Sequence, residues 1–222
     1  MAPSAGTSQL VAQIAVFAVP ILAAVVFHEV AHGAVAYLLG DPTAARRGRL
    51  TLNPIPHVDP IGTILLPGFL LLGAHFLGTP PVIFGYARPV PIDVRRLRNP
   101  RRDSLLVAIA GPGTNLLLAA LSALVLRWLP APGSPASPLV ALHQMAAAGL
   151  SINCVLAVFN LLPIPPLDGG RVLAALLPPG AARALGVFEG IGFVVALLVV
   201  MNTNLVGQLV QPLMALLLDL AR

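Results

Sequence analysis

The segment FHEVAHG, residues 27–33, places three ionisable side chains close together in an otherwise apolar run: His28, Glu29 and His32. Residues four apart on an α-helix are offset by about 40° and lie about 6 Å apart along the axis, so both imidazoles would face the same way. Two such imidazoles can bind one zinc ion, and the adjacent glutamate can take a proton from a water molecule beside it. The pattern therefore predicts a zinc centre with Glu29 as the general base.

A buried polar pair, satisfied by neighbouring helices, is the alternative interpretation of His28 and His32. Each ionisable group inside a membrane costs about 2.5–3.5 kcal/mol on insertion scales. Three such groups with metal-site spacing need a compensating partner, and a divalent cation is the simplest one. The spacing therefore favours the zinc centre.

A catalytic zinc ion takes three protein ligands and leaves one position open. The candidates for the third ligand are His57, Asp59, His75, His143, Asp168, Glu189 and Asp219. On its own, an Asp-Gly pair such as the one at Asp168 is typical of a turn or a helix N-cap. If residues 103–129 run outward, residues 139–162 return and bring Asp168 to the side of His28 and His32. Asp168 is therefore the predicted third ligand.

The composition indicates an integral membrane protein. Hydrophobic residues make up 57% of the chain and charged residues 9%, and the mean hydropathy is +0.90. The net charge of +5 could indicate nucleic-acid binding. The arginines, however, flank apolar segments, which is how membrane proteins carry charge, so no nucleic-acid partner is expected.

Apolar segments long enough to enter a membrane recur along the chain. They cover residues 10–39, 61–84, 103–129, 139–162, 184–201 and, less fully, 205–220. We expect an all-α bundle of about five to six transmembrane or re-entrant segments. The stretches RGRLTLNP (47–54) and YARPVPID (86–93) are predicted to be short interfacial β pieces, confined to edges by their prolines. Residues 1–222 are expected to form a single integral-membrane domain.

Arginines predict the orientation of the bundle. One cluster follows the first apolar segment and another precedes residues 103–129, and positive-inside reasoning places both in the cytoplasm. Both clusters can share one side if residues 61–84 enter the membrane and return. The Pro67-Gly68 break favours such a hairpin, and a single crossing is the competing possibility. The metal would then lie below the cytoplasmic surface.

The HExxH segment, taken with NLLPIPPLDGGRVL, resembles the site-2 proteases, which are integral-membrane zinc metalloproteases. RLTLNPIPHVDPIGTILLP, FGYARPVPID, LRNPRRD and AGPGTN look like segments of the compact prokaryotic members without a PDZ domain. The resemblance runs from about residue 20 to residue 200. It implies one zinc ion per chain held by His28, His32 and Asp168, with Glu29 as general base. LDGG differs from the Asn/Phe-Pro-Asp-Gly motif of the family by a shifted proline, which leaves the acid in place.

Two asparagines, Asn115 in AGPGTN and Asn160 in VFNLLP, also match positions of that family. An amide can donate to a developing oxyanion or hold a substrate backbone, and it can equally connect membrane helices. We predict a catalytic or substrate-positioning role for Asn160, and Asn115 is a further candidate. His57 is a candidate for lining the substrate entry or the oxyanion site, with an interfacial loop histidine as the alternative.

These expectations define a function. The predicted activity is hydrolysis of peptide bonds in membrane-embedded protein substrates near the cytoplasmic face, in a prokaryotic cell membrane. The expected partners are a transmembrane protein or peptide substrate and the lipid bilayer. A metal transporter using the same ligands, or a catalytically inactive scaffold of the family, are the alternatives.

Overall fold

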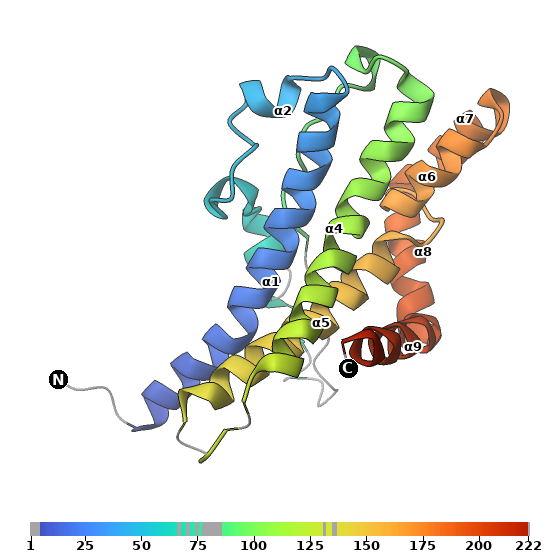
Figure 1. Ribbon diagram of the computed structural model, residues 1–222. Coiled ribbons are helices and arrows are strands. Elements are labelled where there is room, and N and C mark those ends of the chain that lie inside the picture. The colour runs from blue at the N-terminus through green and yellow to red at the C-terminus, as the bar shows by residue number, and fades with distance from the viewer. Residues whose placement is uncertain are drawn as a thin grey trace.

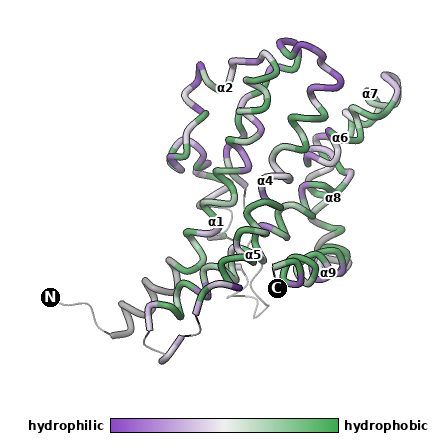
Figure 2. The backbone as a smooth tube through the Cα atoms, viewed as in Figure 1, coloured by the Kyte–Doolittle hydropathy of each residue, from purple (hydrophilic) through white to green (hydrophobic). Residues whose placement is uncertain are grey.

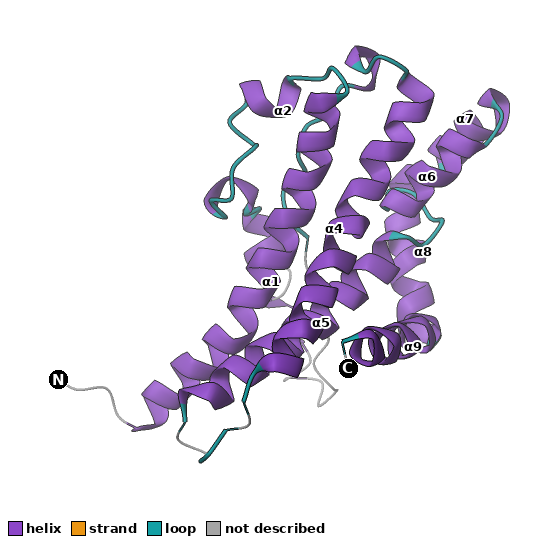
Figure 3. Cartoon of the chain, viewed as in Figure 1, coloured by secondary structure: helices purple, strands orange, loops and turns teal. Residues whose placement is uncertain are grey.

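The computed structural model describes residues 5–65, 68–69, 72–73, 76, 86–130, 132–134 and 137–221. Helices dominate these ranges (Figures 1 and 3). The helices are α1 (Ala5–Leu38), α2 (Thr43–Arg46), α4 (Pro100–Trp128), α5 (Pro138–Asn160), α6 (Asp168–Leu176), α7 (Pro179–Val187), α8 (Glu189–Asn202) and α9 (Leu205–Leu220). Short 3₁₀ turns cover Ile55–His57 and Val94–Arg96, and a π-helical turn covers Pro60–Leu65.

Three of these helices are long and apolar enough to cross a membrane: Val16–Leu38 of α1, Pro100–Trp128 and Pro138–Asn160. A helix satisfies every internal backbone amide within itself, which is what a lipid environment demands. Large apolar side chains such as Leu117 and Leu121 of α4 are exposed, and apolar residues dominate the length of the bundle (Figure 2). The chain is therefore an integral membrane protein.

Helices α1, α4 and α5 pack against one another in pairs, and α9 lies across α4 and α5. The core between α4, α5 and α9 includes Ala119, Ala123, Leu150 and Cys154, all buried. Small side chains allow membrane helices to approach closely. This close approach lets residues on three helices reach one another in the interior.

The expected number of five to six membrane segments is not supported. By length and composition the described residues contain three spans, or up to four if α7 and α8 together form one span. The predicted span 184–201 is divided at Phe188, where Pro179–Val187 and Glu189–Ala196 meet at 52°. Helix α9 has 16 residues, about 24 Å at 1.5 Å per residue, which is shorter than the hydrocarbon core of roughly 30 Å.

The predicted β pieces are wrong, because the described parts of the chain contain no strand. Residues 86–93 run without ladder partners. Pro89 and Pro91 have no amide hydrogen to donate, and Arg49 Nη2 donates to the carbonyl of Arg88 at 2.5 Å and to that of Pro89 at 3.4 Å. The Arg49 side chain therefore makes the hydrogen bonds to these carbonyls that a neighbouring strand would have made.

The loop after α1 and the loop before α4 lie together at one end of the bundle, where hydrophilic residues gather (Figure 2). The buried Asp41 carboxylate accepts hydrogen bonds from the amides of Thr43 at 3.0 Å and Asp93 at 2.7 Å. The amide of Arg98 donates to the carbonyl of Leu39 at 3.1 Å. The two arginine-bearing loops therefore share one end, as the sequence argument required.

The residues that flank the segment 61–84 also lie side by side. The amide of Tyr86 donates to the carbonyl of Gly62 at 3.1 Å, and Thr63 Oγ1 donates to the carbonyl of Tyr86 at 3.0 Å. A single crossing would separate these residues by about 30 Å, so their contact argues against one span, and entry of the segment into the membrane stays a prediction. Most of the intervening chain, His75 included, lies outside the described residues.

Candidate metal centre

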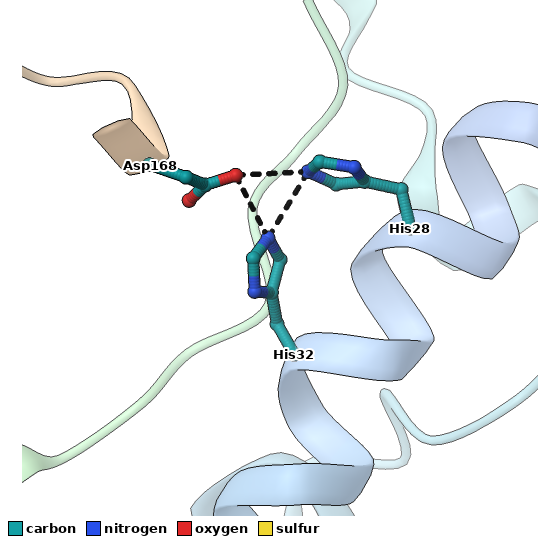
Figure 4. A group of neighbouring side chains, drawn as sticks. All are labelled: His28, His32 and Asp168. Atoms are coloured by element: carbon teal, nitrogen blue, oxygen red, sulfur yellow. Dashed lines mark hydrogen bonds and ion pairs between the residues drawn. The ribbon is translucent and has the colours of Figure 1, made fainter. Parts of the chain in front are cut away.

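His28 and His32 lie one turn apart on α1 and point to the same side of the helix (Figure 4). Their Nε2 atoms are 3.0 Å apart. Both side chains are buried against α4, with 8% and 4% of their surface exposed. The helical spacing of the HExxH pattern therefore produces the expected pair of imidazoles.

Asp168 arrives at this pair from the first turn of α6 (Figure 4). Its Oδ2 lies 3.2 Å from Nε2 of His28 and 3.1 Å from Nε2 of His32. The two glycines after it let α6 begin directly beneath the preceding turn. A Cβ on Gly170 would lie 2.5 Å from the backbone nitrogen of Pro165, and one on Gly169 would overlap the carbonyl of Leu161. The DGG sequence therefore fits both the helix start and this tight packing.

The hydrogen bonds behind the imidazoles determine which nitrogens face the cluster. The Nδ1–H of His32 donates to the carbonyl of Val107 at 2.6 Å, and that of His28 donates to Oδ1 of Asn115 at 2.6 Å. Neutral imidazoles protonated at Nδ1 present lone pairs at Nε2. Such partners behind metal-binding histidines are the usual arrangement at metal sites.

Three electron-rich atoms thus converge, and atoms of this kind repel one another unless a cation lies among them. His28, His32 and Asp168 form a group that could hold a metal ion. Ligands about 2.0–2.1 Å from a tetrahedral zinc ion lie about 3.3 Å apart, close to the spacings of 3.0–3.2 Å found here. Two imidazoles and a carboxylate are also a donor set that zinc uses at catalytic sites, so these residues fit zinc.

The carboxyl group of Asp168 is held in its ionised form. Burial alone would raise its pKa, but an imidazole of His28 or His32 that carries a second proton, at Nε2, outweighs burial and holds the pKa of Asp168 well below its usual range. Arg171, one turn further along α6, adds a guanidinium nitrogen 3.8 Å from Oδ1. The carboxylate is therefore available as a ligand over the whole neutral pH range.

A cavity of about 130 Å³ opens beside the cluster. Its lining includes His28, Glu29, His32, Asn160, Asp168 and Arg171, together with Pro89, Val90 and Ile92. Glu29 Oε2 accepts a hydrogen bond from the amide of Val90 at 2.8 Å. The predicted base is thus fixed between α1 and the extended segment 86–93, at the wall of the same cavity.

The other predicted site residues lie in different places. Asn160 lines the cavity, and its amide donates to the carbonyl of Leu156 at 3.0 Å. Asn115 is fully buried behind His28 and is not itself among the residues that line the cavity. His57 lines a separate apolar pocket between α1 and α5, where its Nε2–H donates to the carbonyl of Thr51 at 2.9 Å.

Sequence reasoning missed two residues near the centre, Arg171 and Asn153. Arg171 lines the cavity, and its position three residues after Asp168 on a helix could have indicated this. Asn153 is buried on α5 and accepts from Asn115 Nδ2 at 2.9 Å. Its spacing of seven from Asn160 corresponds to two helical turns, so a shared inward face of α5 was open to prediction.

Comparison with known proteins agrees with this site. Residues 135–201 match the family model described as peptidase family M50. The chain is 42% identical over 189 residues to "Putative zinc metalloprotease YwhC" of Bacillus subtilis. The matched region covers 84% of this chain and 80% of that relative. No solved structure was found to match the chain.

Two further relatives carry the name "Putative zinc metalloprotease Rip2". The protein of Mycolicibacterium smegmatis is 30% identical over 184 residues, 80% of this chain and 63% of that relative. The protein of Mycobacterium tuberculosis strain H37Rv is 32% identical over 191 residues, 84% of this chain and 66% of that relative. The family match contains Asp168, and the identity to YwhC extends over most of both chains. The chain therefore belongs to peptidase family M50, in agreement with the resemblance to zinc metalloproteases in its sequence.

Proposed function

We propose that this protein is an intramembrane zinc metalloprotease that hydrolyses peptide bonds of membrane-embedded substrates. The observation that carries the proposal is the convergence of His28, His32 and Asp168 beside a small cavity that Glu29 also lines. The proposed metalloprotease domain is the whole chain, residues 1–222, with one zinc ion.

His28, His32 and Asp168 are the proposed zinc ligands. A bound zinc ion would supply Lewis acidity, polarising the scissile carbonyl and a water molecule in the cavity. Glu29 takes a proton from the attacking water and returns it to the leaving amine, which is the role of a general base and then a general acid. The amide of Val90 restrains one carboxylate oxygen of Glu29, which limits the positions from which the carboxylate can act.

Asn160 is proposed to position the substrate, because this last residue of α5 lines the same cavity as the proposed ligands. Arg171 at the same wall is half exposed and places a positive charge beside the opening. A peptide must be unwound to enter, because helical amides are protected by their own hydrogen bonds. The extended segment 86–93 gives an unwound substrate a backbone to lie along.

The location of the site supports cleavage near the cytoplasmic face of a prokaryotic cell membrane. The arginine-bearing loops lie at one end of the bundle, and positive charge marks the cytoplasmic end of membrane proteins. In α1, His28 and His32 lie in the half nearer to that end. The proposed substrate is a transmembrane protein or peptide, presented from the bilayer.

The proposal is tested with the full chain purified in detergent, by zinc analysis and by cleavage of a model transmembrane substrate. Glu29→Gln keeps the size and hydrogen-bonding ability of the side chain but cannot accept the proton. We expect retained zinc with cleavage reduced by about 10²–10⁴-fold, the usual contribution of a general base. Unchanged cleavage in this variant would remove Glu29 from the mechanism. Zinc flux across vesicles with no cleavage by the wild type would replace the protease with a transporter.

A further inference from the structure

Three buried polar side chains form a continuous hydrogen-bonded row across the bundle. Asn153 lies on α5, Asn115 on α4 and His28 on α1. Oδ1 of Asn153 lies 2.9 Å from Nδ2 of Asn115, and Oδ1 of Asn115 lies 2.6 Å from Nδ1 of His28. The row therefore connects a helix without zinc ligands to the proposed metal centre.

Backbone carbonyls at two points fix the direction of every bond in this row. The amide of Asn153 donates to the carbonyl of Gly149 at 2.8 Å, which turns Oδ1 of Asn153 toward Asn115. The amide of Asn115 donates to Oδ1 of Asn153 and to the carbonyl of Ala24 at 3.2 Å. A carbonyl can only accept, so both amide hydrogens of Asn115 are used and its oxygen must face His28.

The reversed orientation of the Asn115 amide is strongly disfavoured. It would set Oδ1 against the carbonyl of Ala24 and against Oδ1 of Asn153, and it would turn the NH₂ group toward His28. Buried acceptors without a donor are costly in a bundle interior. Asn153 therefore fixes the orientation of Asn115 without touching the metal centre itself.

We propose that Asn115, held by Asn153, is the positioning residue that keeps Nδ1 of His28 protonated and its Nε2 free to bind zinc. This inference rests on the proposed zinc centre and deepens it. The Nδ1–H of His32 donates instead to the carbonyl of Val107, which is a backbone group that substitution cannot remove. Of the two imidazoles, only His28 depends here on a side chain. An oxyanion role for Asn115 does not fit, because both amide hydrogens donate elsewhere and its side chain does not line the cavity.

The test compares Asn115→Asp with Asn115→Leu in the full-length protein, by zinc affinity and by the visible spectrum of the Co²⁺-substituted form. Asn115→Asp keeps an oxygen acceptor toward His28 but sets its second oxygen against the carbonyl of Ala24 and Oδ1 of Asn153. It therefore lowers the stability of the fold, and zinc affinity is compared in the folded protein. Asn115→Leu is similar in size and loses the acceptor as well. We expect zinc binding near that of the wild type for Asn115→Asp. For Asn115→Leu we expect binding weaker by about 10–100-fold, the usual effect of removing a partner behind a ligand, with an altered Co²⁺ spectrum.

Asn153→Leu tests the outer member of the row. Either oxygen of a carboxylate can accept from His28. In Asn115→Asp, residue 115 therefore has no amide group whose orientation Asn153 could fix. We therefore expect Asn153→Leu to weaken zinc binding severalfold in the wild-type background and to have no such effect on top of Asn115→Asp. A residue that only connects helices would cost the same in both backgrounds. This comparison also carries the test if Asn115→Leu does not fold.

Ser122→Ala is the matched control, since Ser122 lies on α4 two turns beyond Asn115 and donates only to the carbonyl of Leu118 in its own helix. It should leave zinc affinity unchanged. Zinc affinity of folded Asn115→Leu equal to that of the wild type, or equal losses in Asn115→Asp and Asn115→Leu, would overturn the inference. If the wild type itself binds no zinc, the proposed metal centre fails instead.

Discussion

A single backbone amide restrains the proposed general base. Glu29 Oε2 accepts from the amide of Val90 at 2.8 Å, and Val90 lies between two prolines that have no amide hydrogen. Val90→Pro would remove this one donor. We expect kcat for a model substrate to fall by tenfold or more, because a base displaced by a fraction of an ångström loses much of its effect.

Val90→Ala is the control for this change, since it removes side-chain contacts but keeps the N–H group. Both variants should bind zinc as tightly as the wild type, because Val90 is not a ligand. Equal rates of cleavage in Val90→Pro and Val90→Ala would show that the amide does not position the base.

The proposed ligands also predict how zinc affinity depends on pH. Imidazoles that gain a second proton hold the pKa of Asp168 well below its usual range although burial alone would raise it, so the carboxylate stays ionised while the imidazoles take up protons. Protons then compete with zinc only at the two imidazoles. Zinc affinity should fall as the pH decreases, approaching about tenfold per pH unit for each imidazole that must give up a proton.

Competition with a chromophoric chelator at each pH measures this dependence. An affinity that stays constant down to pH 5 would show that the imidazoles are not ligands. His143→Ala serves as the control, because His143 lies on α5 with its Nδ1 bonded to the carbonyl of Leu139. It should leave the pH profile unchanged.

Among elements, the approach of α4 to α1 is the contact on which the metal centre depends. A Cβ on Gly111 of α4 would lie 2.6 Å from Cε1 of His28 and closer still to Nε2 of His32. We expect Gly111→Ala to displace at least one imidazole and to weaken zinc binding by tenfold or more, in line with the sensitivity of ligand orientation.

Gly113 on the same helix provides a matched control, because a Cβ there would meet no atom within 4 Å. Replacing glycine by alanine inside a helix stabilises it by up to about 1 kcal/mol. Gly113→Ala should therefore bind zinc normally and unfold at the same or a higher temperature. Normal zinc binding by Gly111→Ala would show that α4 can move away from α1 without disturbing the centre.

The sequence predicts the long helices and the convergence of His28, His32 and Asp168, because both follow from regular spacing. HExxH lies on one helical face, and the return of α5 brings Asp168 back to that end of α1. It predicts irregular chain poorly. Residues 86–93 have the composition of an edge strand, yet their carbonyls bond to Arg49, which lies 39 residues before Arg88. The break at Phe188 was missed too, because residues 184–201 are apolar apart from Glu189, which lies directly after the break.

The partners behind the imidazoles show a different limit. The carbonyl of Val107 supports His32, and a backbone carbonyl has no signature in the sequence. Asn115 could be selected as a buried polar residue, but its direction depends on Asn153 and on the carbonyl of Ala24. The orientation of the Asn115 amide is determined by contacts between helices. Residue spacing alone therefore cannot decide whether Asn115 has a catalytic or a supporting role.

At the scale of the whole molecule, the proposed metal centre ties the first long helix to the last third of the chain. His28 and His32 lie on α1, and Asp168 begins α6. A ligand that binds only the folded state stabilises it by about 4.1 kcal/mol at a concentration of 1,000 times its Kd. Removing zinc with a chelator should therefore lower the thermal unfolding midpoint of the detergent-solubilised protein.

Re-addition of zinc should restore that midpoint in the wild type and in Glu29→Gln, since both keep all three proposed ligands. Asp168→Ala should show a much smaller zinc-dependent shift, because the remaining pair of imidazoles binds zinc more weakly and no longer connects the two parts of the chain. The comparison distinguishes zinc binding by the imidazoles from a zinc-mediated connection between α1 and α6. Zinc that still binds to Asp168→Ala through the imidazoles would stabilise α1 alone. A zinc-dependent shift of equal size in Asp168→Ala and the wild type would exclude Asp168 as the residue that joins α6 to the metal.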